Sequence, residues 1–346
     1  MGKKLLSQIT NATAGILLYF SAAIAHGCAV EEQYNESPRR NFEAFWKLID
    51  ENYCFFEYKN IDWNQVYDKY STTITDSTNQ HELFRTLSHM ADELQDGHIN
   101  ITSFYAFSAY EGWYSAYPSN FNWNVIQSYL EGSLRAGDYD EIRYKTLADG
   151  QIGYIYYGSF HESILETGLN KIFDAFAGCH GLIIDVRNNG GGSLTNSDRL
   201  AARFTDKRIH CGYIRHKTGK GHNDFSDAYP LYLEPYNVGH TWLKPVIVLT
   251  NRRCYSAGNN FVAKVGILPN VLTLGDTTGG GSGFPLTSEL PNGWRVRFSS
   301  SPILDVNNQH TEFGIAPNIP ISLDPTDEEK HVDTLIEAAI KILSNI

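Results

Sequence analysis

The stretch Pro245-Val-Ile-Val-Leu-Thr-Asn-Arg-Arg-Cys-Tyr-Ser256-Ala-Gly-Asn-Asn-Phe261 contains a serine between an apolar run and a helix-like segment. Residues 245–250 have the length and apolar character of a buried strand, and a helix is expected over 257–265. A tight turn between them would hold the Ser256 hydroxyl rigidly beside the free backbone N–H groups of the helix start. This favours a nucleophilic Ser256 over its neighbour Cys254. The alternative is that Ser256 is only a helix N-cap, a position that serines favour.

The chain from residue 151 onward alternates between strand-like and helix-like segments. Further strands are expected at 152–157, 181–186 and 271–275, a hairpin at 284–300, and helices at 164–176, 195–204 and 327–343. Successive strand–loop–helix units are typical of an α/β domain with a mainly parallel sheet and flanking helices. The functional loops of such a domain follow the carboxyl ends of its strands. We therefore assign residues 151–346 to an α/β core domain.

The segment before the core domain has helical periodicity at first. Phe42, Phe45 and Ile49 recur at spacings of three and four residues, which predicts an amphipathic helix. The pattern ends at the turn signal Gln95-Asp-Gly-His98. We expect an N-terminal helical domain over 38–98, followed by a short β-rich connecting region over 99–150. Within the core domain, residues 206–240 form a long polar insertion.

The first 28 residues resemble a secretory signal. Two lysines near the start precede a mostly apolar stretch, residues 14–25, and small residues follow it. The Gly-Cys pair that ends at Cys28 resembles the lipobox of bacterial lipoproteins, in which the cysteine is lipidated. We expect a signal peptide over 1–27, a polar tether over 28–37, and an extracytoplasmic protein of the bacterial cell envelope (periplasm or outer membrane). A plain signal peptide with a chance cysteine is the alternative.

Composition argues against several classes of function. The 346-residue chain has 28 Lys and Arg against 39 Asp and Glu, a formal charge of −11 at pH 7. This balance argues against nucleic acid as a partner, and we expect membrane contact only through a lipid anchor at Cys28. The four other cysteines have no zinc-ligand spacing, although disulfides are possible in an oxidising compartment. We expect neither a metal ion nor another cofactor.

Five motifs occur in a fixed order along the chain. They are Leu94-Gln-Asp-Gly-His98, Ile184-Asp-Val-Arg-Asn-Asn-Gly-Gly-Gly192, Tyr255-Ser-Ala-Gly-Asn-Asn-Phe261, Gly275-Asp-Thr-Thr-Gly-Gly-Gly281 and Glu312-Phe-Gly-Ile-Ala-Pro-Asn318. Together they resemble the carboxyl-terminal processing peptidases, the tail-specific proteases that include the core module of tricorn protease. The resemblance covers most of residues 38–325. It implies a crotonase/ClpP-like α/β fold and a serine peptidase that acts on peptide or unfolded protein substrates.

The family contains two catalytic arrangements. Many members use a Ser–Lys dyad, but here no lysine lies between Lys264 and Lys330, and Gly280 stands roughly where that lysine would be. The tricorn-like branch instead uses a serine, a histidine from the helical domain and a glutamate near the C-terminus. The resemblance therefore implies a nucleophile, a general base and an orienting carboxylate at Ser256, His98 and Glu312. It also implies oxyanion-hole N–H donors at Gly191 and Ala257.

Three departures from the family pattern bear on this assignment. Gly97 stands where tricorn-like members carry a second serine before the histidine, and Asn259 stands where an acidic residue is common. Residues 101–150 are too short and irregular for a complete PDZ domain, which many members use to capture carboxyl termini.

Two alternative functions remain. One is a non-catalytic peptide- or lipid-binding module on the same fold, as in the retinoid-binding repeats of an interphotoreceptor protein. The other is an α/β-hydrolase esterase that uses His331.

Overall fold

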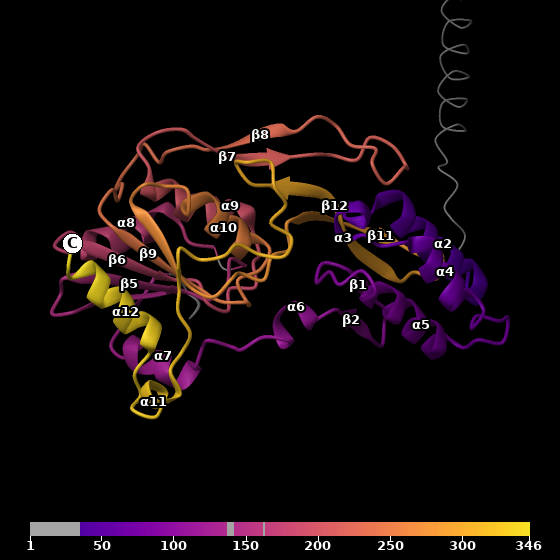
Figure 1. Ribbon diagram of the computed structural model, residues 1–346, viewed down its shortest axis with the longest axis horizontal. Helices are drawn as coiled ribbons and strands as arrows, with labels where there is room; N and C mark the ends of the chain where they lie inside the picture. Colours follow the sequence, from indigo (N-terminus) through magenta and orange to yellow (C-terminus); the bar gives the residue numbers. More distant parts are fainter. Residues whose placement is uncertain (1–34, 137–141, 162) are drawn as a thin grey trace, which may run out of the picture.

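The computed structural model describes residues 35–136, 142–161 and 163–346. The expected signal peptide over 1–27, and Cys28 with most of the tether, lie outside the described residues. Figure 1 shows an α/β part and a helical part with strands running between them. Within the described ranges, no helix is both long enough and apolar enough to cross a membrane.

The larger sheet has seven strands in the order β13-β10-β9-β6-β5-β4-β3. These are β3 (Leu134–Arg135), β4 (Ile142–Leu147), β5 (Ile152–Tyr157), β6 (Gly181–Asp185), β9 (Val246–Thr250), β10 (Val271–Gly275) and β13 (Ile319–Pro320). Strands β13, β10, β9, β6 and β5 are parallel, whereas β4 and β3 are added antiparallel. The predicted mainly parallel α/β sheet is therefore confirmed. The expected domain boundary at 151 falls inside this sheet, because β3 and β4 precede it.

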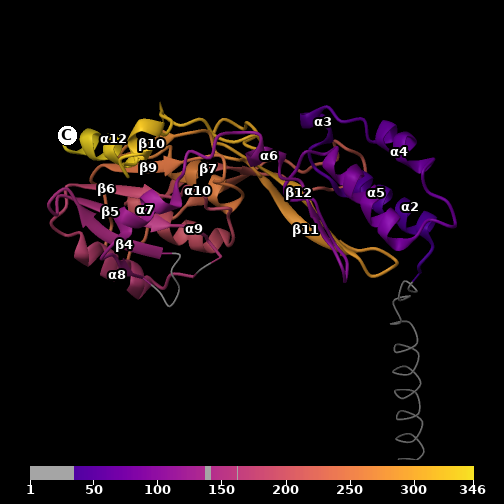
Figure 2. The same ribbon diagram turned by 90° about the horizontal axis from the view of Figure 1, so that it is seen from below.

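Helices cover both faces of this sheet because its central strands are apolar on both sides. On β6, Leu182 and Ile184 join the core under three helices, and Ile183 joins the core on the opposite face. The first face carries α8 (Glu166–Ala175), α9 (Leu194–Ala201) and α10 (Ala257–Val265), and the second carries α7 (Trp123–Leu130) and α12 (Thr334–Leu343). Figure 2 shows α8 and α12 on opposite sides of the sheet.

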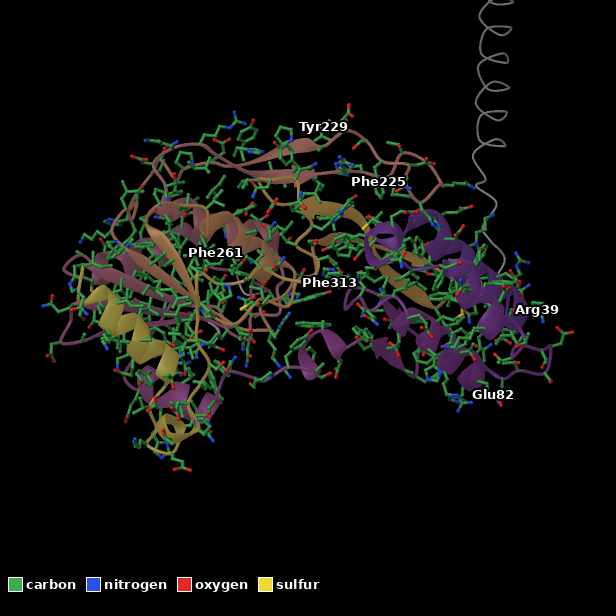
Figure 3. The ribbon with its side chains drawn as sticks, viewed as in Figure 1. Arg39, Glu82, Phe225, Tyr229, Phe261 and Phe313 are labelled. Atoms are coloured by element: carbon green, nitrogen blue, oxygen red, sulfur yellow. The ribbon has the colours of Figure 1, made fainter. Side chains whose placement is uncertain are left out.

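A second sheet connects the α/β part to the helical part. Its strands follow the order β2-β1-β12-β7-β8, and β11 also pairs with β12. They are β1 (Asn100–Thr102), β2 (Phe107–Ala109), β7 (Ile209–Ile214), β8 (Tyr229–Leu233), β11 (Gly283–Glu289) and β12 (Arg295–Leu304). Strands β11 and β12 form the predicted hairpin. The sequence did not predict β7 and β8, which lie in the polar insertion 206–240. Burial along them does not alternate, and Tyr229, labelled in Figure 3, is 55% exposed.

The helical part follows its predicted periodicity. It contains α2 (Pro38–Asn52), α3 (Phe56–Lys59), α4 (Trp63–Ser71) and α5 (Gln80–Asp92). Phe42, Phe45 and Ile49 of α2 are fully buried. The same core includes Val296 and Phe298 of β12. The helical domain is therefore packed directly onto the sheet that leads to the core domain.

The arm formed by β7, β8 and the loop between them makes a second connection. The His222 ring in that loop stacks on Phe56 of α3, with 4.2 Å between ring centroids. His222 Nε2 also lies 2.9 Å from Asp50 Oδ1 of α2. The insertion thus links the core domain to the helical domain.

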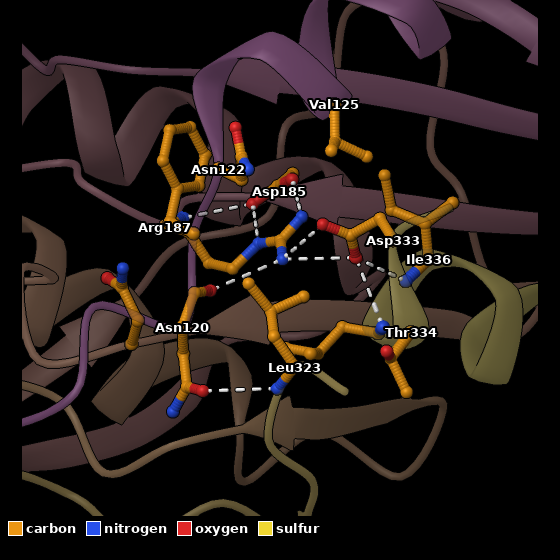
Figure 4. Close-up of polar contacts among 12 residues, drawn as sticks. Asn120, Asn122, Val125, Asp185, Arg187, Leu323, Asp333, Thr334 and Ile336 are labelled. Atoms are coloured by element: carbon orange, nitrogen blue, oxygen red, sulfur yellow. Dashed lines mark hydrogen bonds and ion pairs between the residues drawn. The ribbon is translucent and has the colours of Figure 1, made fainter. Parts of the chain in front are cut away.

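A buried ion network fixes the loop that follows β6 (Figure 4). The fully buried Arg187 guanidinium lies 2.7 Å from Asp185 Oδ2 and 2.9 Å from Asp333 Oδ2. Asp333 also accepts the N–H groups of Leu335 and Ile336 and so caps α12. For this reason the single helix expected over 327–343 is replaced by α11 (Pro325–Glu328) and α12. The network ties the carboxyl end of β6, and the glycine-rich loop after it, to α12.

Replacing Asp333 with alanine is expected to destabilise the protein by about 3–5 kcal/mol, because Arg187 stays buried after losing one of its two carboxylates. Urea unfolding measures this loss. The matched control is Arg208→Ala, which breaks an ion pair with Glu234 in which both side chains are at least 60% exposed; its cost should stay below about 1 kcal/mol. Equal losses in the two variants would contradict a structural role for the network.

Candidate active site

Ser256 stands on the turn between β9 and α10, as the sequence predicts. Its backbone has φ 56° and ψ −116°, a strained conformation for a residue with a side chain. Its N–H donates to Gly280 O at 2.9 Å, which joins this turn to the loop after β10. The hydroxyl makes no cap hydrogen bond to α10. Ser256 is therefore not an ordinary helix cap.

The Ser256 hydroxyl instead meets the His98 ring. Oγ and Nε2 are 2.9 Å apart, although 158 positions separate the two residues in the chain. His98 lies in the turn between α5 and β1 and is only 2% exposed. His331, the base of the esterase alternative, lies exposed in the turn after α11. The helical domain thus supplies the histidine that faces the serine of the core domain.

Burial sets the charge of His98. It lowers the pKa of His98 from 6.5 to about 4; the Asp96 carboxylate opposes this shift, and the positive charges of Arg297 and Lys59 add to it. At neutral pH the ring is uncharged and can accept the Ser256 proton at Nε2, with its own proton on Nδ1. Nδ1 is buried and has no hydrogen-bond partner within the described ranges.

Glu312 lies in the same buried region, and its carboxylate contacts Lys59 and Ser282. Its Oε1 lies 2.9 Å from Lys59 Nζ, and its Oε2 accepts the N–H of Ser282 at 2.8 Å. Burial, followed by the Asp96 charge, raises the pKa of Glu312 to about 7, and Lys59 acts in the opposite direction. The structure therefore joins Glu312 to Lys59, and the orienting role implied by the resemblance stays a prediction.

Gly97 stands where tricorn-like members carry a second serine, and its surroundings leave no room for a side chain. A Cβ on Gly97 would lie 2.5 Å from Nε1 of Trp113. Trp113 belongs to α6 (Gly112–Ser115), and its indole stacks on Tyr255 with 4.0 Å between ring centroids. The indole thus occupies the space that a side chain at position 97 would need.

Sequence reasoning missed two buried charged residues beside His98. Asp96 accepts the N–H of His98 and the hydroxyl of Ser299, both at 2.8 Å. Lys59, the last residue of α3, contacts Glu312 as described. Asp96 belongs to the motif at 94–98 and could have been singled out there. No motif surrounds Lys59, so its position becomes visible only when the helical domain has folded.

The two expected oxyanion donors differ in availability. Ala257 is the first residue of α10, and no acceptor bonds its N–H within the part of the chain described. Gly191 lies directly against Ser256, because a Cβ there would be 2.8 Å from the Ser256 Cβ. However, the Gly191 N–H already donates to Asn189 Oδ1 at 3.0 Å. Gly191 therefore has the expected location, but its donor is occupied.

The structure also argues against a Ser–Lys dyad and against a cysteine nucleophile. A side chain at Gly280 is excluded because a Cβ would lie 1.8 Å from Glu312 O, so a dyad lysine cannot occupy that position. Lys264 of α10 pairs instead with Asp198. Burial raises the pKa of the Cys254 thiol to about 12, which removes the thiolate needed for attack. Cys54, Cys179, Cys211 and Cys254 are all free, so none forms one of the disulfides considered above.

Two cavities meet at Ser256. One of about 380 Å³ has apolar side chains from several elements in its lining, including Leu194, Leu231 and Ile303. The other, of about 540 Å³, contains His98 and the β12 residue Arg295. Ser256 lines both cavities, so each of them adjoins the turn that carries its hydroxyl.

Comparisons with known proteins give the family of the chain. The family description "Peptidase family S41" matches residues 151–321, and "Tricorn protease C1 domain" matches residues 34–92. A solved candidate peptidase from Parabacteroides merdae is 52% identical, with a TM-score of 0.85 over 89% of this chain and 97% of that one. The chain belongs to peptidase family S41. Members of family S41 are serine proteases, and the family resemblance drawn from the motifs is confirmed.

Two more distant S41 comparisons extend this result. The carboxy-terminal processing protease CtpA of Bacillus subtilis (strain 168) is 25% identical over 186 residues, which span 53% of this chain and 38% of that protein. The match thus covers less than two thirds of this relative's length. Mature CPAF is 13% identical, with a TM-score of 0.66 over 89% of this chain and 96% of that one, and shows the shared fold.

Proposed function

We propose that this S41 chain is a serine peptidase that hydrolyses peptide bonds of proteins or oligopeptides through an acyl-enzyme on Ser256. The observation that carries the proposal is the 2.9 Å separation between Ser256 Oγ and His98 Nε2. A serine hydroxyl is a weak nucleophile until a base within hydrogen-bond reach takes its proton. The strained turn and the adjoining cavities supply a fixed nucleophile with space for a substrate.

The reaction follows from these positions. His98 Nε2 takes the Ser256 proton while Oγ bonds to the carbonyl carbon, and the resulting oxyanion accepts the N–H of Ala257. The imidazolium then gives its proton to the leaving amine as the C–N bond breaks. A water molecule attacks the ester, His98 takes its proton, and that proton returns to Oγ. Peptide hydrolysis thereby restores the enzyme without a cofactor.

Two assignments in this scheme depend on groups that are otherwise engaged. We propose that Gly191 becomes the second oxyanion donor when its N–H exchanges Asn189 Oδ1 for the substrate oxygen, since the loop already lies against Ser256. We propose that Glu312 stabilises the imidazolium through its charge from the buried cluster with Asp96 and Lys59. A buried charge acts more strongly than a charge in water. If Glu312→Gln lowers kcat by less than about twofold, Glu312 does not stabilise the imidazolium.

The acid limb of kcat/KM is expected to fall near pH 4. Burial lowers the pKa of His98 to about 4, so the neutral imidazole that acts as base persists as the pH falls and is lost only near that value. A pH profile measured with a peptide substrate from pH 3.5 to 9 checks this. An acid limb near pH 6.5 in both the unmodified protein and Glu312→Gln would contradict a lowered pKa for His98. Burial also raises the pKa of Glu312 to about 7, so a partial fall in rate near pH 7 that disappears in Glu312→Gln would report loss of the Glu312 charge and support its proposed role.

A fluorophosphonate probe tests the proposed function as a whole. Folded protein should form one covalent adduct on Ser256, and a peptide substrate should compete with the labelling. Heat-denatured protein is the control, because an unfolded chain lacks the His98 contact. If the folded protein is not labelled, the chain is not a serine hydrolase and the binding-module alternative is favoured. Labelling without hydrolysis of any unfolded protein or peptide would favour an esterase.

We further propose that the protein is extracytoplasmic and is anchored to the cell envelope through a lipid on Cys28. The support is the signal-like sequence of residues 1–28 alone. Fractionation of bacteria expressing the full chain tests this, with Cys28→Ser as the control. If both forms are equally soluble, the lipid anchor is ruled out.

A further inference from the structure

The His98 ring lacks the direct support that a catalytic histidine usually receives. Its Nδ1 has no hydrogen-bond partner within the described ranges, and the Glu312 carboxylate bonds Lys59 and Ser282 instead. A ring that no acceptor orients through Nδ1 must be positioned by its own backbone and by packing. The turn over residues 94–98 therefore decides where Nε2 lies relative to Ser256 Oγ.

Lys59 holds this turn from the side of the helical domain. Its Nζ donates to Leu94 O and to Gln95 O, each at 3.2 Å, and lies 2.9 Å from Glu312 Oε1. An ammonium group has three donors, and these three contacts use all of them. A single side chain thus connects α3, the turn that carries His98 and the loop that carries Glu312.

The environment keeps the Lys59 ammonium charged. Its side chain is only 3% exposed, and Asp96 Oδ2 lies 3.9 Å from Nζ in addition to the Glu312 contact. Burial acts to lower the pKa of Lys59, but the Asp96 and Glu312 charges outweigh it and raise the pKa above its ordinary value. Three aromatic rings, including Phe313 (labelled in Figure 3), lie 5.5–5.9 Å from Nζ and keep water away.

Other titratable groups also face this cluster. The groups around Lys59 and His98 are Tyr53, Cys54, Tyr58, Asp96, Tyr255, Arg297 and Glu312. Burial raises the pKa of Tyr53, Cys54 and Tyr255 well above their ordinary values, so these three are neutral near pH 7. Lys59 and Arg297 are thus the cations that balance the Asp96 and Glu312 carboxylates.

We propose that Lys59 is a positioning residue for the reaction at Ser256, because it clamps the His98 turn to the Glu312 loop and so sets His98 Nε2 against Ser256 Oγ. The inference rests on the proposed function. Without the ammonium, the carbonyls of Leu94 and Gln95 lose their donor and two buried carboxylates lose a counter-charge. The turn then relaxes, and a misplacement of about 1 Å costs about 10²-fold in rate.

The test compares three variants with the unmodified full chain on one peptide substrate. Lys59→Gln removes the charge at similar length, Lys59→Arg keeps the charge, and Lys69→Gln removes an exposed lysine that pairs with Glu93 in the same domain. We expect Lys59→Gln to lower kcat about 10²-fold with KM changed less than about threefold. Lys59→Arg should recover about tenfold or more of that loss, and Lys69→Gln should match the unmodified protein.

The pH profile separates positioning from general loss of structure. The Lys59 charge lowers the pKa of His98, so removing it raises that pKa and moves the acid limb of kcat/KM to higher pH. Lys59→Arg should leave the limb in place. A purely structural weakening would lower activity at every pH without moving the limb.

Each outcome decides the proposal. If Lys59→Gln has normal kcat and an unmoved acid limb while Ser256→Ala is inactive, the positioning role is wrong and the proposed function stands. If the unmodified protein itself neither turns over peptide nor reacts with fluorophosphonate, the proposed function fails. Thermal unfolding tests whether Lys59→Gln folds. If it does not, the double variant Lys59→Gln/Glu312→Gln replaces the single variant, because it leaves only the Asp96 carboxylate without the lysine charge. That double variant should still have a kcat about 10²-fold below Glu312→Gln alone, and equal values would overturn the inference.

Discussion

Replacing Ser256 with alanine should lower kcat/KM for a peptide substrate by about 10⁶-fold, because the nucleophile and its base act as a unit. The fold should persist, since the Ser256 hydroxyl caps no helix and forms its hydrogen bond with His98. Peptide assays at saturating and at limiting substrate concentrations measure the loss. A cooperative thermal unfolding transition shows that the variant is folded.

Ser193→Ala is the matched control for this prediction. Ser193 also precedes a helix of the core domain, is exposed, and makes no side-chain cap hydrogen bond. Its substitution should leave kcat/KM within about twofold, as for other surface changes away from special features. A Ser256→Ala variant that retains more than about 1% of the activity would contradict the account, because no acyl-enzyme could form on that residue.

Replacing His98 with alanine should cost about as much, again on the order of 10⁶-fold in kcat/KM. The residual activity should equal that of Ser256→Ala, and the double variant should be no slower than either single variant. This non-additivity is the kinetic sign that the hydroxyl and the imidazole work together. The same peptide assay measures all three proteins.

His331→Ala is the control for the histidine prediction. His331 is exposed on the turn after α11, and its loss should leave activity unchanged. An active His98→Ala variant together with an inactive His331→Ala variant would support the esterase alternative and reject His98 as the base.

Much of the fold, and the position of Ser256, could be predicted from local sequence. The apolar run before Ser256 and the helical spacing after it are local signals, and the structure has β9, a turn and α10 in those places. His98 was predicted from an ordered motif, since no local signal relates residues 158 positions apart. The mainly parallel sheet followed from repeated strand–loop–helix units.

The parts that sequence reasoning missed depend on tertiary contacts. Strand β7 pairs with both β8 and β12, but burial along β7 and β8 does not alternate, so no alternating pattern marks them as strands. Helix α12 begins only at Thr334 because Asp333, which bonds the buried Arg187, caps it. The motif at 312–318 placed Glu312 near the site, but its bond to Lys59 depends on how the helical domain docks.

Covalent trapping tests the central claim most directly. A slowly deacylating ester or acyl inhibitor is mixed with the full chain, the reaction is quenched in acid, and peptide mapping by mass spectrometry locates the acyl group. The account predicts one acyl group on Ser256 in the unmodified protein, and at least about 10³-fold slower acylation in the folded His98→Ala variant. Acylation at another residue, or unchanged acylation of Ser256 without His98, would contradict it.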